Sequence, residues 1–543
     1  MFENKIYAVF WAFIVLLYLC AAYFIEIMDV DAAQYASIAL EMTKSDNWMI
    51  VQHKGVDYLD KPPLLFWLSA LSFKIFGAGH FAYRFPSILA TFLGLYATYA
   101  LGRRLYDAKT AKLAALILAS AQAWVLFNHD IRTDTLLAAF CITSIWQLVE
   151  YGENRKWYNF LFGFICVGLA MLAKGPLGVV IPAIALSAYW LGQKHWKILF
   201  LPEWILGIII VLLVLSPMLI GLWQQWQWDG IYFYFWKQSF GRITGENSWR
   251  NDSGAFFFVH SFLWSFLPWS LVALWAFAKR SCQYWTKGAD RELLTFFGFL
   301  VPFVALSFSK YKLPHYIFPL YPFMAIITAQ AMLSLIEKDN MVKKIFVAIQ
   351  YIISVLIFAL AVLICCWFFP TANAVLWSIV VISAFLIIYL HTNISLFKEK
   401  VIAMSIISVL MINFVMSLHF YPQLFSYQSG SRAAVFIKEQ KIVPEELAVY
   451  RLYPNSLDFY SGIIAQVFES PDKLINAVSA HPLWIFTDET GKKQLEEYGA
   501  IIGNVKTFNH FHISKLSLKF LNPKTRAGVT GKAYLLRVSG VVS

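Results

Sequence analysis

Residues 199–221 read LFLPEWILGIIIVLLVLSPMLIG and carry a single charged side chain, that of Glu203. A helix of this length is about 35 Å long, which is enough to cross the hydrocarbon core of a bilayer. The whole chain has 543 residues, of which 59% are hydrophobic and 14% are charged, and its mean hydropathy is +0.60. In a soluble protein about 25% of the residues are charged. The composition therefore predicts an α-helical, polytopic membrane protein.

Further apolar stretches of similar length follow along the chain, so that about thirteen transmembrane helices are expected. Besides 199–221, they are residues 8–25, 82–101, 111–128, 133–149, 158–173, 176–192, 255–278, 292–308, 316–336, 345–367, 375–391 and 401–419. The first stretch lacks a small-residue cleavage site behind its apolar core. This favours an uncleaved helix over a signal peptide.

Basic residues gather in alternate loops between these stretches. They are Arg103, Arg104, Lys109, Arg155, Lys156, Lys194, Lys197, Lys279, Arg280, Lys287, Arg291, Lys343, Lys344, Lys398 and Lys400. Loops rich in Lys and Arg remain in the cytoplasm, so the N-terminus is expected there as well. The other loops are then outside, and they include residues 28–80, residues 222–254 and the chain after residue 420.

The first outer loop, residues 28–80, contains two predicted helices. Residues 31–43 have apolar side chains on one face and polar ones on the other, which is typical of an amphipathic helix. Pro62 and Pro63 precede an apolar run that ends near Gly77, and proline is favoured in the first turn of a helix. This run is short for a transmembrane span, so we expect both helices to lie along the outer surface of the membrane.

The chain changes character after residue 425. Residues 1–425 form the predicted transmembrane domain, whereas residues 426–543 have polar turns and alternating helix and strand patterns. These patterns predict a small α/β domain outside the membrane. The predicted helices are 433–440, 470–478 and 493–498, and the predicted strands are 447–452, 483–487 and 533–538. His510 and His512 alternate on a strand-like stretch, and we expect them at the surface rather than in a metal site.

Charged motifs are concentrated in the outer loops and at the outer ends of the spans. They are Asp29-Val30-Asp31, Tyr58-Leu59-Asp60-Lys61-Pro62-Pro63, Asp130-Ile131-Arg132-Thr133-Asp134, Lys174-Gly175-Pro176 and Ser309-Lys310-Tyr311-Lys312-Leu313-Pro314-His315. Charged side chains near a membrane are costly unless they are paired or functional. A pure anchor has no need to gather them at one face. The pattern favours an enzyme that acts on a lipid at the membrane surface.

The net charge of +12 fits anionic lipid and phosphate as partners. The sequence shows no basic stripe on a soluble nucleic-acid-binding fold, so nucleic acid is not an expected partner. The six cysteines lie in apolar spans or in a short basic loop. Their positions indicate no disulfide framework.

Several of the charged residues are candidates for chemistry. Asp31 and Asp134 lie where helices are predicted to begin, so each carboxylate either caps its helix or faces a shared site. Lys61 either extends its ammonium group to the lipid headgroups or binds a lipid phosphate. Five further cations are expected near the same outer cavity, where they would suit a phosphate-bearing substrate. They are Lys174, Arg242, Lys310, Lys312 and His315.

Four motifs resemble the bacterial lipid A aminoarabinose transferase family, which is related to the protein O-mannosyltransferases and shares their GT-C integral-membrane fold. The motifs are Asp31-Ala-Ala-Gln-Tyr-Ala36, Tyr58-Leu-Asp-Lys61-Pro-Pro63, Lys174-Gly175 and Lys310-Tyr-Lys312-Leu-Pro314-His-Tyr316. The segment from Tyr234 through Arg242 to Leu267-Pro-Trp269 is similar to that family as well. The resemblance covers residues 1–330 or so, and the later part resembles the family only in layout.

The resemblance implies roles for individual residues. Asp31 matches the catalytic aspartate of the family, Asp134 matches a second acid near the active cavity, and Lys61 matches the lysine that meets the donor phosphate. Three other residues of the matching motifs are expected to contact substrate. They are Tyr35, Tyr58 and Lys174.

The chain also departs from the pattern of the family. Ala32 and Gln34 stand where the family has Glu and Arg, so Asp29 is a candidate for the second acid. Asp60 stands where the family has Glu, and it is the candidate ligand for a divalent cation. These departures bear on the sugar and the acceptor more than on the type of reaction.

The resemblance implies an inverting glycosyltransferase of the bacterial inner membrane, with its active site and C-terminal domain in the periplasm. The donor is a polyprenyl-phosphate sugar, expected to be undecaprenyl phosphate, and the acceptor is lipid A or a related glycolipid. Lys61, Arg242 and Lys310 or Lys312 stabilise the charge on the departing lipid phosphate. Asp31 acts as a general base towards a hydroxyl acceptor, or positions a phosphate acceptor. No cofactor is required beyond the cation considered at Asp60.

Two alternatives remain open. The same donor could serve transfer to Ser or Thr of exported proteins, as in the protein O-mannosyltransferases. A flippase or transporter of lipid-linked sugars would need charged or broken helices at mid-membrane, often arranged as repeats, whereas the charges of this chain cluster at outer span ends. The sequence leaves the identity of the sugar, the acceptor and the oligomeric state open.

Overall fold

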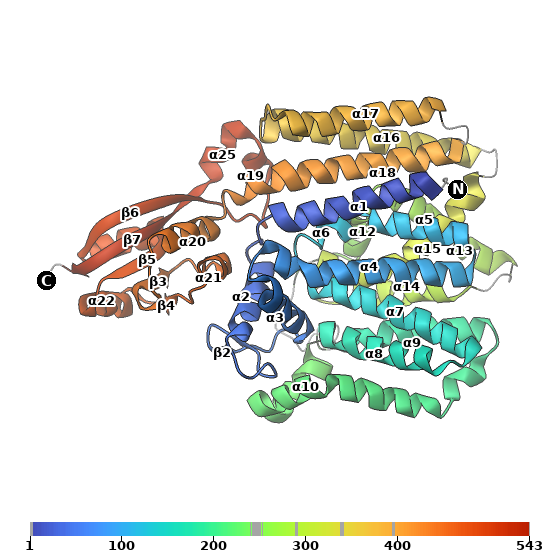
Figure 1. Cartoon of the computed structure of the whole chain (residues 1–543), viewed down its shortest axis with the longest axis horizontal. Coiled ribbons are helices and arrows are strands. Elements are labelled where there is room, and N and C mark those ends of the chain that lie inside the picture. Colours follow the sequence, from blue (N-terminus) through green and yellow to red (C-terminus); the bar gives the residue numbers. More distant parts are fainter. Residues whose placement is uncertain are drawn as a thin grey trace.

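A helical bundle and a small domain make up the molecule. The computed structural model describes residues 4–238, 241, 251, 253–287, 292–336, 341–393 and 397–541. Figure 1 shows long, roughly parallel helices and, joined to one end of them, a domain built around a sheet. Helices α2 (Asp31–Thr43) and α3 (Leu64–Phe76) lie at that end, which is called the α2 end of the bundle below.

Nine helical segments of the described residues are long and apolar enough to cross a membrane. They are Lys5–Phe24, His80–Leu105, Thr133–Asn154, Trp157–Lys174, Glu203–Lys237, Pro314–Leu335, Met341–Phe368, Ala374–Thr392 and Glu399–Phe425. Each coincides with one of the predicted spans. The prediction of a polytopic helical membrane protein is therefore confirmed.

The other four predicted spans are helical too, but they are shorter or interrupted, so the expected total of about thirteen stays a prediction. The interruption within residues 255–278 contains Pro268, which has no N–H to donate to a helical hydrogen bond. The helices found at these four places are α5 (Ala108–Ala119), α6 (Gln122–Leu126), α9 (Leu177–Gly192), α12 (Phe257–Ser265), α13 (Ser270–Lys287) and α14 (Leu294–Ser307).

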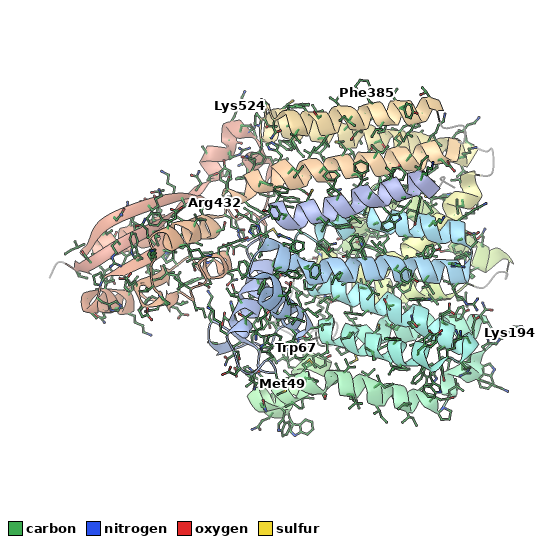
Figure 2. The ribbon with its side chains drawn as sticks, viewed as in Figure 1. Met49, Trp67, Lys194, Phe385, Arg432 and Lys524 are labelled. Atoms are coloured by element: carbon green, nitrogen blue, oxygen red, sulfur yellow. The ribbon has the colours of Figure 1, made fainter. Side chains whose placement is uncertain are left out.

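Long helices form the rest of the bundle. They are α1 (Asn4–Phe24), α4 (His80–Leu105), α7 (Thr133–Asn154), α8 (Trp157–Lys174), α10 (Glu203–Tyr232), α15 (Tyr321–Ile336), α16 (Met341–Leu363), α17 (Ala374–Asn393) and α18 (Phe397–Val415). Short helical segments adjoin them, namely η1 (Trp196–Phe200), η2 (Phe233–Lys237), η3 (Pro314–Leu320), η4 (Ile364–Phe368), η5 (Met416–Phe420) and α19 (Tyr421–Phe425). Lys194, from a loop predicted to be cytoplasmic, lies at the end opposite α2 (Figure 2). This position agrees with the prediction that the basic loops and the charged motifs lie at opposite ends of the helices.

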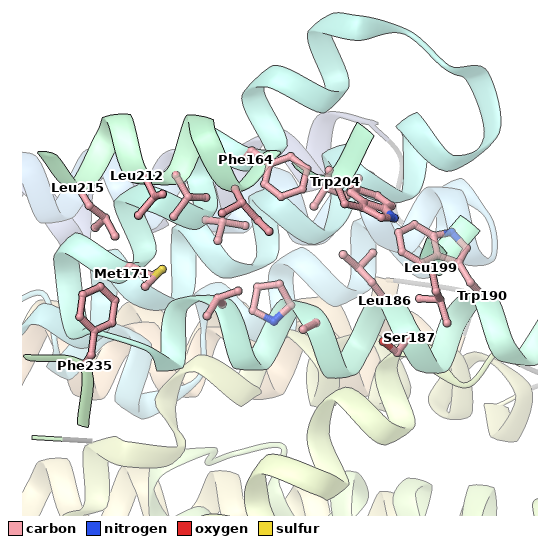
Figure 3. A pocket seen from close by; sticks show the side chains of 17 residues that line it. Phe164, Met171, Leu186, Ser187, Trp190, Leu199, Trp204, Leu212, Leu215 and Phe235 are labelled. Atoms are coloured by element: carbon pink, nitrogen blue, oxygen red, sulfur yellow. The ribbon is translucent and has the colours of Figure 1, made fainter. Parts of the chain in front are cut away.

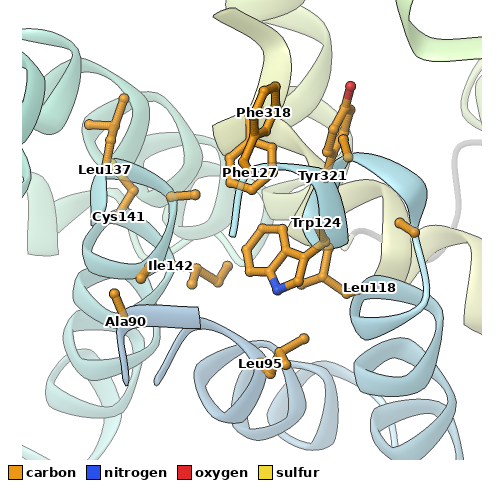
Figure 4. Packing of buried hydrophobic residues seen from close by; sticks show 14 of the residues in the cluster. Ala90, Leu95, Leu118, Trp124, Phe127, Leu137, Cys141, Ile142, Phe318 and Tyr321 are labelled. Carbon is orange, nitrogen blue, oxygen red and sulfur yellow. The ribbon is translucent and has the colours of Figure 1, made fainter. Parts of the chain in front are cut away.

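Aromatic and aliphatic side chains, with a few small ones, pack together inside the bundle (Figure 4). Trp124 is fully buried, and its ring stacks on that of Phe318 with 4.7 Å between the ring centroids. Helices α4 and α7 approach closely at Gly94, where a methyl group would lie 3.2 Å from Cα of Ala139. Small residues permit such packing in membrane proteins, where van der Waals contact drives helix association. The contact holds together two helices that both carry charged side chains towards the α2 end.

The two helices predicted in the first outer loop are present. Helix α2 has the predicted bounds, and α3 begins directly after Pro63. They pack on each other through Tyr35 and Phe66, whose ring centroids are 5.7 Å apart. A hairpin of β1 (Gln52–His53) and β2 (Val56–Asp57) lies between them in the chain. Both helices are thus confirmed and form a compact unit at the α2 end.

The chain after α19 folds into the small α/β domain that the sequence predicts. Its five-stranded sheet has the order β4-β3-β5-β7-β6, with β3 parallel to β4 and β5, and β7 antiparallel to β5 and β6. The strands are β3 (Leu447–Tyr450), β4 (Gln466–Phe468), β5 (Leu483–Asp488), β6 (Ala500–His510) and β7 (Gly531–Val541). The helices are α20 (Ser429–Glu439), α21 (Asn455–Ser461), α22 (Pro471–Ala480), α23 (Glu489–Glu497), α24 (Leu518–Leu521) and α25 (Pro523–Val529).

Every helix and strand predicted in this domain is present with shifted bounds. No prediction covered the edge strand β4 or helices α21, α24 and α25, and of the edge strand β6 only the end near His510 was indicated. Most side chains of β4 and β6 are at least partly exposed, so neither strand shows the clear alternation of buried and exposed residues on which strand prediction depends. His510 ends β6, and its Nδ1 lies 2.7 Å from Oγ of Ser429, whereas His512 lies beyond the strand. Neither histidine belongs to a metal-ligand cluster among the described residues.

Ion pairs join the small domain to the α2 end of the bundle. Arg432 lies at the junction in Figure 2, and its Nη2 is 2.6 Å from Oε1 of Glu26. Nζ of Lys54, in the β1–β2 hairpin, is 2.9 Å from Oδ2 of Asp458. These contacts fix the domain against the segment after α1 and against the first outer loop.

Asp29 makes a further contact across this junction. Its carboxylate accepts hydrogen bonds from the backbone N–H of Ser456, at 2.8 Å, and from the hydroxyl of the same residue. Burial raises the pKa of Asp29 to about 6, although the hydrogen bonds from Ser456 act in the opposite direction. The carboxyl group therefore binds its proton more tightly in the folded protein than in the unfolded chain.

We expect the Asp29→Asn variant to reveal this raised pKa. A carboxyl whose pKa is raised on folding contributes stability at low pH, and the contribution is lost as the pH rises from about 4 to about 6. Asparagine has no such titration. The melting temperature of the variant minus that of the wild type, measured in detergent, should increase over this range and stay constant above it. A difference that is independent of pH would contradict the burial of Asp29 at the junction.

Candidate active site

An arginine lies between two acids at the α2 end of the bundle. Nη1 of Arg132 is 2.6 Å from Oδ2 of Asp31, and its Nε donates to Oδ2 of Asp130 at 2.8 Å. Asp31 begins α2, whereas Asp130 and Arg132 lie in the loop between α6 and α7. The side chain of Asp31 is 37% exposed, compared with 10% for that of Asp130. Asp31 is therefore the member of this cluster that an external substrate can reach most easily.

A second arginine holds the two parts of this cluster together. Arg84 of α4 is completely buried. Its guanidinium donates to the carbonyl oxygens of Ile25 at 2.6 Å, Glu26 at 2.8 Å and His129 at 3.0 Å. The segment that leads to Asp31 and the loop that carries Arg132 are thereby bound to the same side chain.

The residue before Asp31 has a strained backbone. Val30 has φ 105° and ψ −99°, a conformation in which a β-branched residue is a clear outlier. Such strain costs about 1–3 kcal/mol and persists only where the surrounding structure holds it. The start of α2 is therefore set by tertiary contacts and not by the local preference of the chain.

Capping does not account for the two acids at the helix starts. The N-cap residues of α2 and α7 are Val30 and Arg132, and neither makes a side-chain capping hydrogen bond. Asp31 and Asp134 lie in the first turns of these helices, where the helix dipole favours a negative charge. Each carboxylate forms an ion pair there, Asp31 with Arg132 and Asp134 with Lys174.

The ion pair of Asp134 and Lys174 is buried. The side chains of the two residues are 2% and 13% exposed. Nζ of Lys174, at the end of α8, also lies 4.8 Å from the centroid of the Tyr316 ring in η3, which is within reach of a cation–π interaction. The pair thus joins α7, α8 and η3 at the α2 end.

A cavity of about 160 Å³ reaches two of the predicted cations. Lys61 and Lys174 line it together with the polar residues Gln238, Ser309 and Tyr316, and its other walls are apolar side chains, mostly from α9 and α14. Binding sites of this kind take apolar groups along their walls and use a few polar groups to orient the ligand. The cavity suits an amphiphile with an anionic head group and a hydrocarbon tail.

Three other predicted residues belong to the first outer loop, namely Tyr35, Tyr58 and Asp60. Tyr35 is 3% exposed and belongs to the packed interior of the α2 end. Tyr58 and Lys61 line a smaller cavity together. The carbonyl oxygen of Asp60 accepts a hydrogen bond from Nε2 of Gln238. The substrate contacts expected of Tyr35 and Tyr58 stay predictions.

Lys312 binds the end of the outer loop that was predicted for residues 222–254. Its Nζ lies 3.1 Å from the carbonyl oxygen of Ser253 and 3.1 Å from that of Gly254. Only 6% of the residue is exposed. These contacts direct the ammonium group to the backbone of the loop, and binding of a donor phosphate by Lys312 stays a prediction.

Three further cations were predicted to contact the donor phosphate. Lys310 is exposed. The ring of His315 packs edge-on against Phe127, with 6.2 Å between the centroids. Arg242 lies outside the described residues. Phosphate binding by these three residues also stays a prediction.

The second acid near Asp31 is Asp130 in this structure. Asp29, which was the candidate from the sequence, contacts Ser456 of the small domain. Asp130 instead shares the guanidinium of Arg132 with Asp31. Burial raises the pKa of Asp130, while the charge of Arg132 acts to lower it.

A metal site at Asp60 is not supported by its neighbours. No group of three or more His, Cys, Asp or Glu side chains within the described part of the chain is arranged to hold a metal ion. Hard divalent cations are held by several oxygen ligands, of which carboxylates are the main charged ones. The described residues therefore do not fit a cation bound by the protein alone at this place.

A larger cavity of about 480 Å³ lies between α8, α9 and α10. Figure 3 shows apolar and aromatic side chains around it, with Met171 and Phe235 near one end and Trp190 and Trp204 near the other. Met171 lies one turn of α8 before Lys174. Hydrocarbon-lined space thus approaches the charged residues of the α2 end from a second direction.

Several polar residues of the site received no role from the sequence. They include Arg84, Asp130, Arg132, Gln238, Ser309 and Tyr316. Arg132 lies between Asp130 and Asp134 in the chain, and this alternation of opposite charges is a signal for an ion pair. Gln238 carries no such signal, because an uncharged side chain in a long outer loop has the pattern of a surface residue.

Known proteins are similar to this chain in sequence. The family model described as dolichyl-phosphate-mannose-protein mannosyltransferase matches residues 60–221. The undecaprenyl phosphate-alpha-4-amino-4-deoxy-L-arabinose arabinosyl transferase of Edwardsiella ictaluri is 29% identical over 308 residues, which cover 55% of this chain and 54% of that protein. The protein of the same name from Pseudomonas aeruginosa strain UCBPP-PA14 is 28% identical over 320 residues, which cover 58% and 57%. The chain thus spans little more than half the length of these curated relatives.

Solved structures share the fold. The crystal structure of ArnT from Cupriavidus metallidurans bound to undecaprenyl phosphate matches with a TM-score of 0.77 and 17% identity, over 98% of each chain. The crystal structure of the Archaeoglobus fulgidus oligosaccharyltransferase in the apo form matches with a TM-score of 0.51 and 13% identity, over 87% of this chain and 65% of the other. The GT-C fold expected from the sequence is confirmed.

The buried pair of Asp134 and Lys174 can be tested by a double-mutant cycle. In Asp134→Asn the ammonium of Lys174 stays buried without its carboxylate, so we expect the free energy of unfolding to fall by about 3–5 kcal/mol. Lys174→Met should lower the free energy of unfolding by a similar amount. The double variant leaves no uncompensated charge and should recover most of the loss. Melting temperatures in detergent measure the effect, and strictly additive losses would contradict the pairing.

Proposed function

We propose that this chain, an aminoarabinose-transferase-like protein with the GT-C fold, transfers a sugar from a polyprenyl-phosphate donor, undecaprenyl phosphate, to lipid A or a related glycolipid. The observation that carries the proposal is the cavity whose apolar walls lead to Lys61 and Lys174. A polyprenyl phosphate has the matching parts, a hydrocarbon chain and an anionic head group. The lipid in the ArnT structure from C. metallidurans supports this choice of donor.

The α2 end then faces the periplasm and the opposite end faces the cytoplasm of a bacterial inner membrane. The basic loops support this orientation, since Lys194 lies at the end opposite α2 (Figure 2). The small domain, which adjoins the α2 end, is periplasmic in the same arrangement. A sugar donor and lipid A would meet at this surface of the membrane.

The reaction breaks the bond between the anomeric carbon and the phosphate oxygen and forms a bond from that carbon to an oxygen of the acceptor. The carbon passes through an oxocarbenium-like state, and the electron pair of the broken bond leaves with the lipid phosphate. A single displacement inverts the configuration. Lys61 offsets the charge that develops on the phosphate. We assign it the main role because Lys61 lines the cavity and matches the lysine that meets the donor phosphate in the family that the motifs resemble.

Asp31 acts on the acceptor side of the reaction. It is the exposed acid of the cluster, and Arg132 orients it. A hydroxyl acceptor would give its proton to Asp31 as the oxygen attacks. A lipid A phosphate is already anionic, and Asp31 would then hold the sugar in place for the attack.

The larger apolar cavity provides space for the second lipid. A reaction between two lipids needs hydrocarbon-lined space for both of them. The cavity between α8, α9 and α10 borders Met171, one helical turn from Lys174. An acyl chain in this cavity would leave the head group of its lipid next to the donor site. We therefore assign the cavity to an acyl chain of the acceptor.

A second candidate is transfer to Ser or Thr of exported proteins. The match of residues 60–221 to the protein mannosyltransferase model favours it. A protein acceptor has no acyl chain to occupy the apolar cavity of about 480 Å³, so this cavity favours a glycolipid acceptor. A flippase has less support, because the three ion pairs described for the site lie at the α2 end, whereas transporters bind their cargo near mid-membrane.

Transfer can be tested with purified protein, undecaprenyl-phosphate aminoarabinose and lipid A. We expect a gain of one aminoarabinose residue on lipid A by mass spectrometry. Asp31→Asn should lower kcat by at least about a hundredfold, the range found for loss of general acid–base catalysis. Lys61→Met should lower kcat and kcat/KM together, because its cation stabilises the leaving phosphate.

Each alternative gives a different result in this assay. Labelled Ser or Thr of an exported peptide, with unmodified lipid A, would favour the second candidate. Donor movement across a vesicle membrane without release of undecaprenyl phosphate would favour a flippase. Full activity of Asp31→Asn would remove Asp31 from the mechanism but leave the reaction standing.

Filling the larger cavity tests where the acceptor binds. Ala183 lines it and is exposed towards its open space. Ala183→Trp should raise the KM for lipid A by about tenfold or more, because the indole would take the place of acyl-chain carbons whose burial is worth more than about 1.4 kcal/mol. The KM for the donor should stay the same. Leu213 of α10 is 67% exposed on the outside of the bundle, so Leu213→Trp serves as the control. An equal increase in KM for lipid A and for the donor would refute the assignment of this cavity to the acceptor.

A further inference from the structure

The segment that leads into α2 is bound by side chains from the C-terminal domain. The backbone N–H of Ile27 donates to the hydroxyl of Tyr460 at 2.6 Å. Gln428 binds this segment twice: its Nε2 donates to the carbonyl oxygen of Ile27 at 3.0 Å, and its Oε1 accepts from the N–H of Asp29 at 2.7 Å. The two ends of each hydrogen bond lie about four hundred residues apart in the chain. The domain thus provides hydrogen-bond partners for backbone groups of this segment.

The same domain also binds the side chain of Asp29. Its carboxylate accepts from the backbone N–H and the hydroxyl of Ser456, which has no exposed surface. Nδ2 of Asn455 lies 3.4 Å from the carbonyl oxygen of Val30. Ile27, Asp29 and Val30 are therefore each hydrogen-bonded to a residue of α21 or to Gln428, which directly precedes α20.

The strained residue lies between this bound segment and Asp31. Val30 has φ 105°, and a valine released from its surroundings returns to a negative φ. Rotation at Val30 changes the direction in which the first residue of α2 leaves the segment. The position of the Asp31 carboxylate against Arg132 thus depends on how firmly Ile27 and Asp29 are held.

We propose that the C-terminal domain acts as a clamp that keeps Val30 in its strained conformation and thereby positions Asp31 for the reaction. Gln428 and Ser456 are the positioning residues of this clamp. The inference rests on the proposed function, in which Asp31 is the catalytic residue. It gives the soluble domain of a membrane enzyme a part in the chemistry without any contact between the domain and the substrate.

Other contacts hold the domain without touching this segment. Lys54 and Asp458 form an ion pair between the β1–β2 hairpin and α21. The double variant Lys54→Gln/Asp458→Asn removes the charges of this pair and leaves the partners of Ile27 and Asp29 in place. It is the matched control, because it weakens the attachment of the domain but not the clamp.

Kinetics of Gln428→Leu and Ser456→Ala test the clamp. We expect Gln428→Leu to lower kcat for transfer by about tenfold or more, with the donor KM unchanged, since the positioning of Asp31 and not the binding of the donor is lost. Ser456→Ala should act in the same direction but less strongly, because the backbone N–H of Ser456 still binds Asp29. The control variant should keep the wild-type kcat. Equal losses in the control and in Gln428→Leu would overturn the clamp in favour of a general effect of domain attachment.

Replacement of Val30 by glycine provides a rescue that only the clamp predicts. Glycine adopts positive φ without strain, so the position of Asp31 depends less on the domain in Val30→Gly. The loss of kcat caused by Gln428→Leu should therefore be several-fold smaller in the Val30→Gly background than in the wild type. A loss of the same size in both backgrounds would show that strain at Val30 plays no part.

Hydrogen exchange tests the clamp without reference to activity. In Gln428→Leu the amides of Ile27 to Ala33 should exchange at least about tenfold faster than in the wild type, while the core of the bundle remains protected. If the protein transfers no sugar, the proposed function fails and this measurement still decides the clamp. If Asp31→Asn abolishes transfer but Gln428→Leu changes neither kcat nor exchange, the function stands and the clamp fails.

Discussion

The burial of one guanidinium, that of Arg84, determines how the α2 end is built. Arg84 has no exposed surface, and a cation in such a place is tolerated only when its donors are satisfied. Carbonyl oxygens of Ile25, Glu26 and His129 satisfy them. This requirement brings the end of α1 against the loop before α7, although the two segments are far apart in the chain. Asp31 and Arg132 meet a few residues further along these segments.

The bundle separates two kinds of surface, one apolar and one charged. Along most of their length the helices present apolar side chains, which form the walls of both cavities. Charged groups are costly in a membrane, and the ion pairs of Asp31 and Asp134 lie where α2 and α7 begin. Hydrocarbon chains can therefore lie between the helices while their head groups meet at one end. The same physical separation that makes the protein stable in a bilayer would orient the amphiphilic substrates proposed above.

The small domain extends this arrangement beyond the membrane. Its contacts with the bundle include hydrogen bonds to the segment between α1 and α2, an ion pair to the β1–β2 hairpin and a hydrogen bond from Ser37 of α2 to Asn455. The carboxylate of Asp31 lies on a short helix outside the bundle and is not fixed by the packing of the long helices. The hydrogen bonds of Gln428 and Ser456 hold the segment before this helix, and a backbone as strained as that of Val30 persists only where its surroundings hold it.

Hydropathy, periodicity and loop charge by themselves determined the class of the protein, nine of its long helices, helices α2 and α3, and the α/β character of the tail. Such properties depend on neighbouring residues, so a sequence displays them directly. The motifs also indicated Lys61, Lys174 and the acids Asp31 and Asp134. Only the tertiary structure decided which charges pair, because a partner is chosen by distance between segments that the sequence cannot measure. It placed Arg132 against Asp31 and turned Asp29 towards Ser456, since burial of each charge demanded a partner and the fold brought those two within reach.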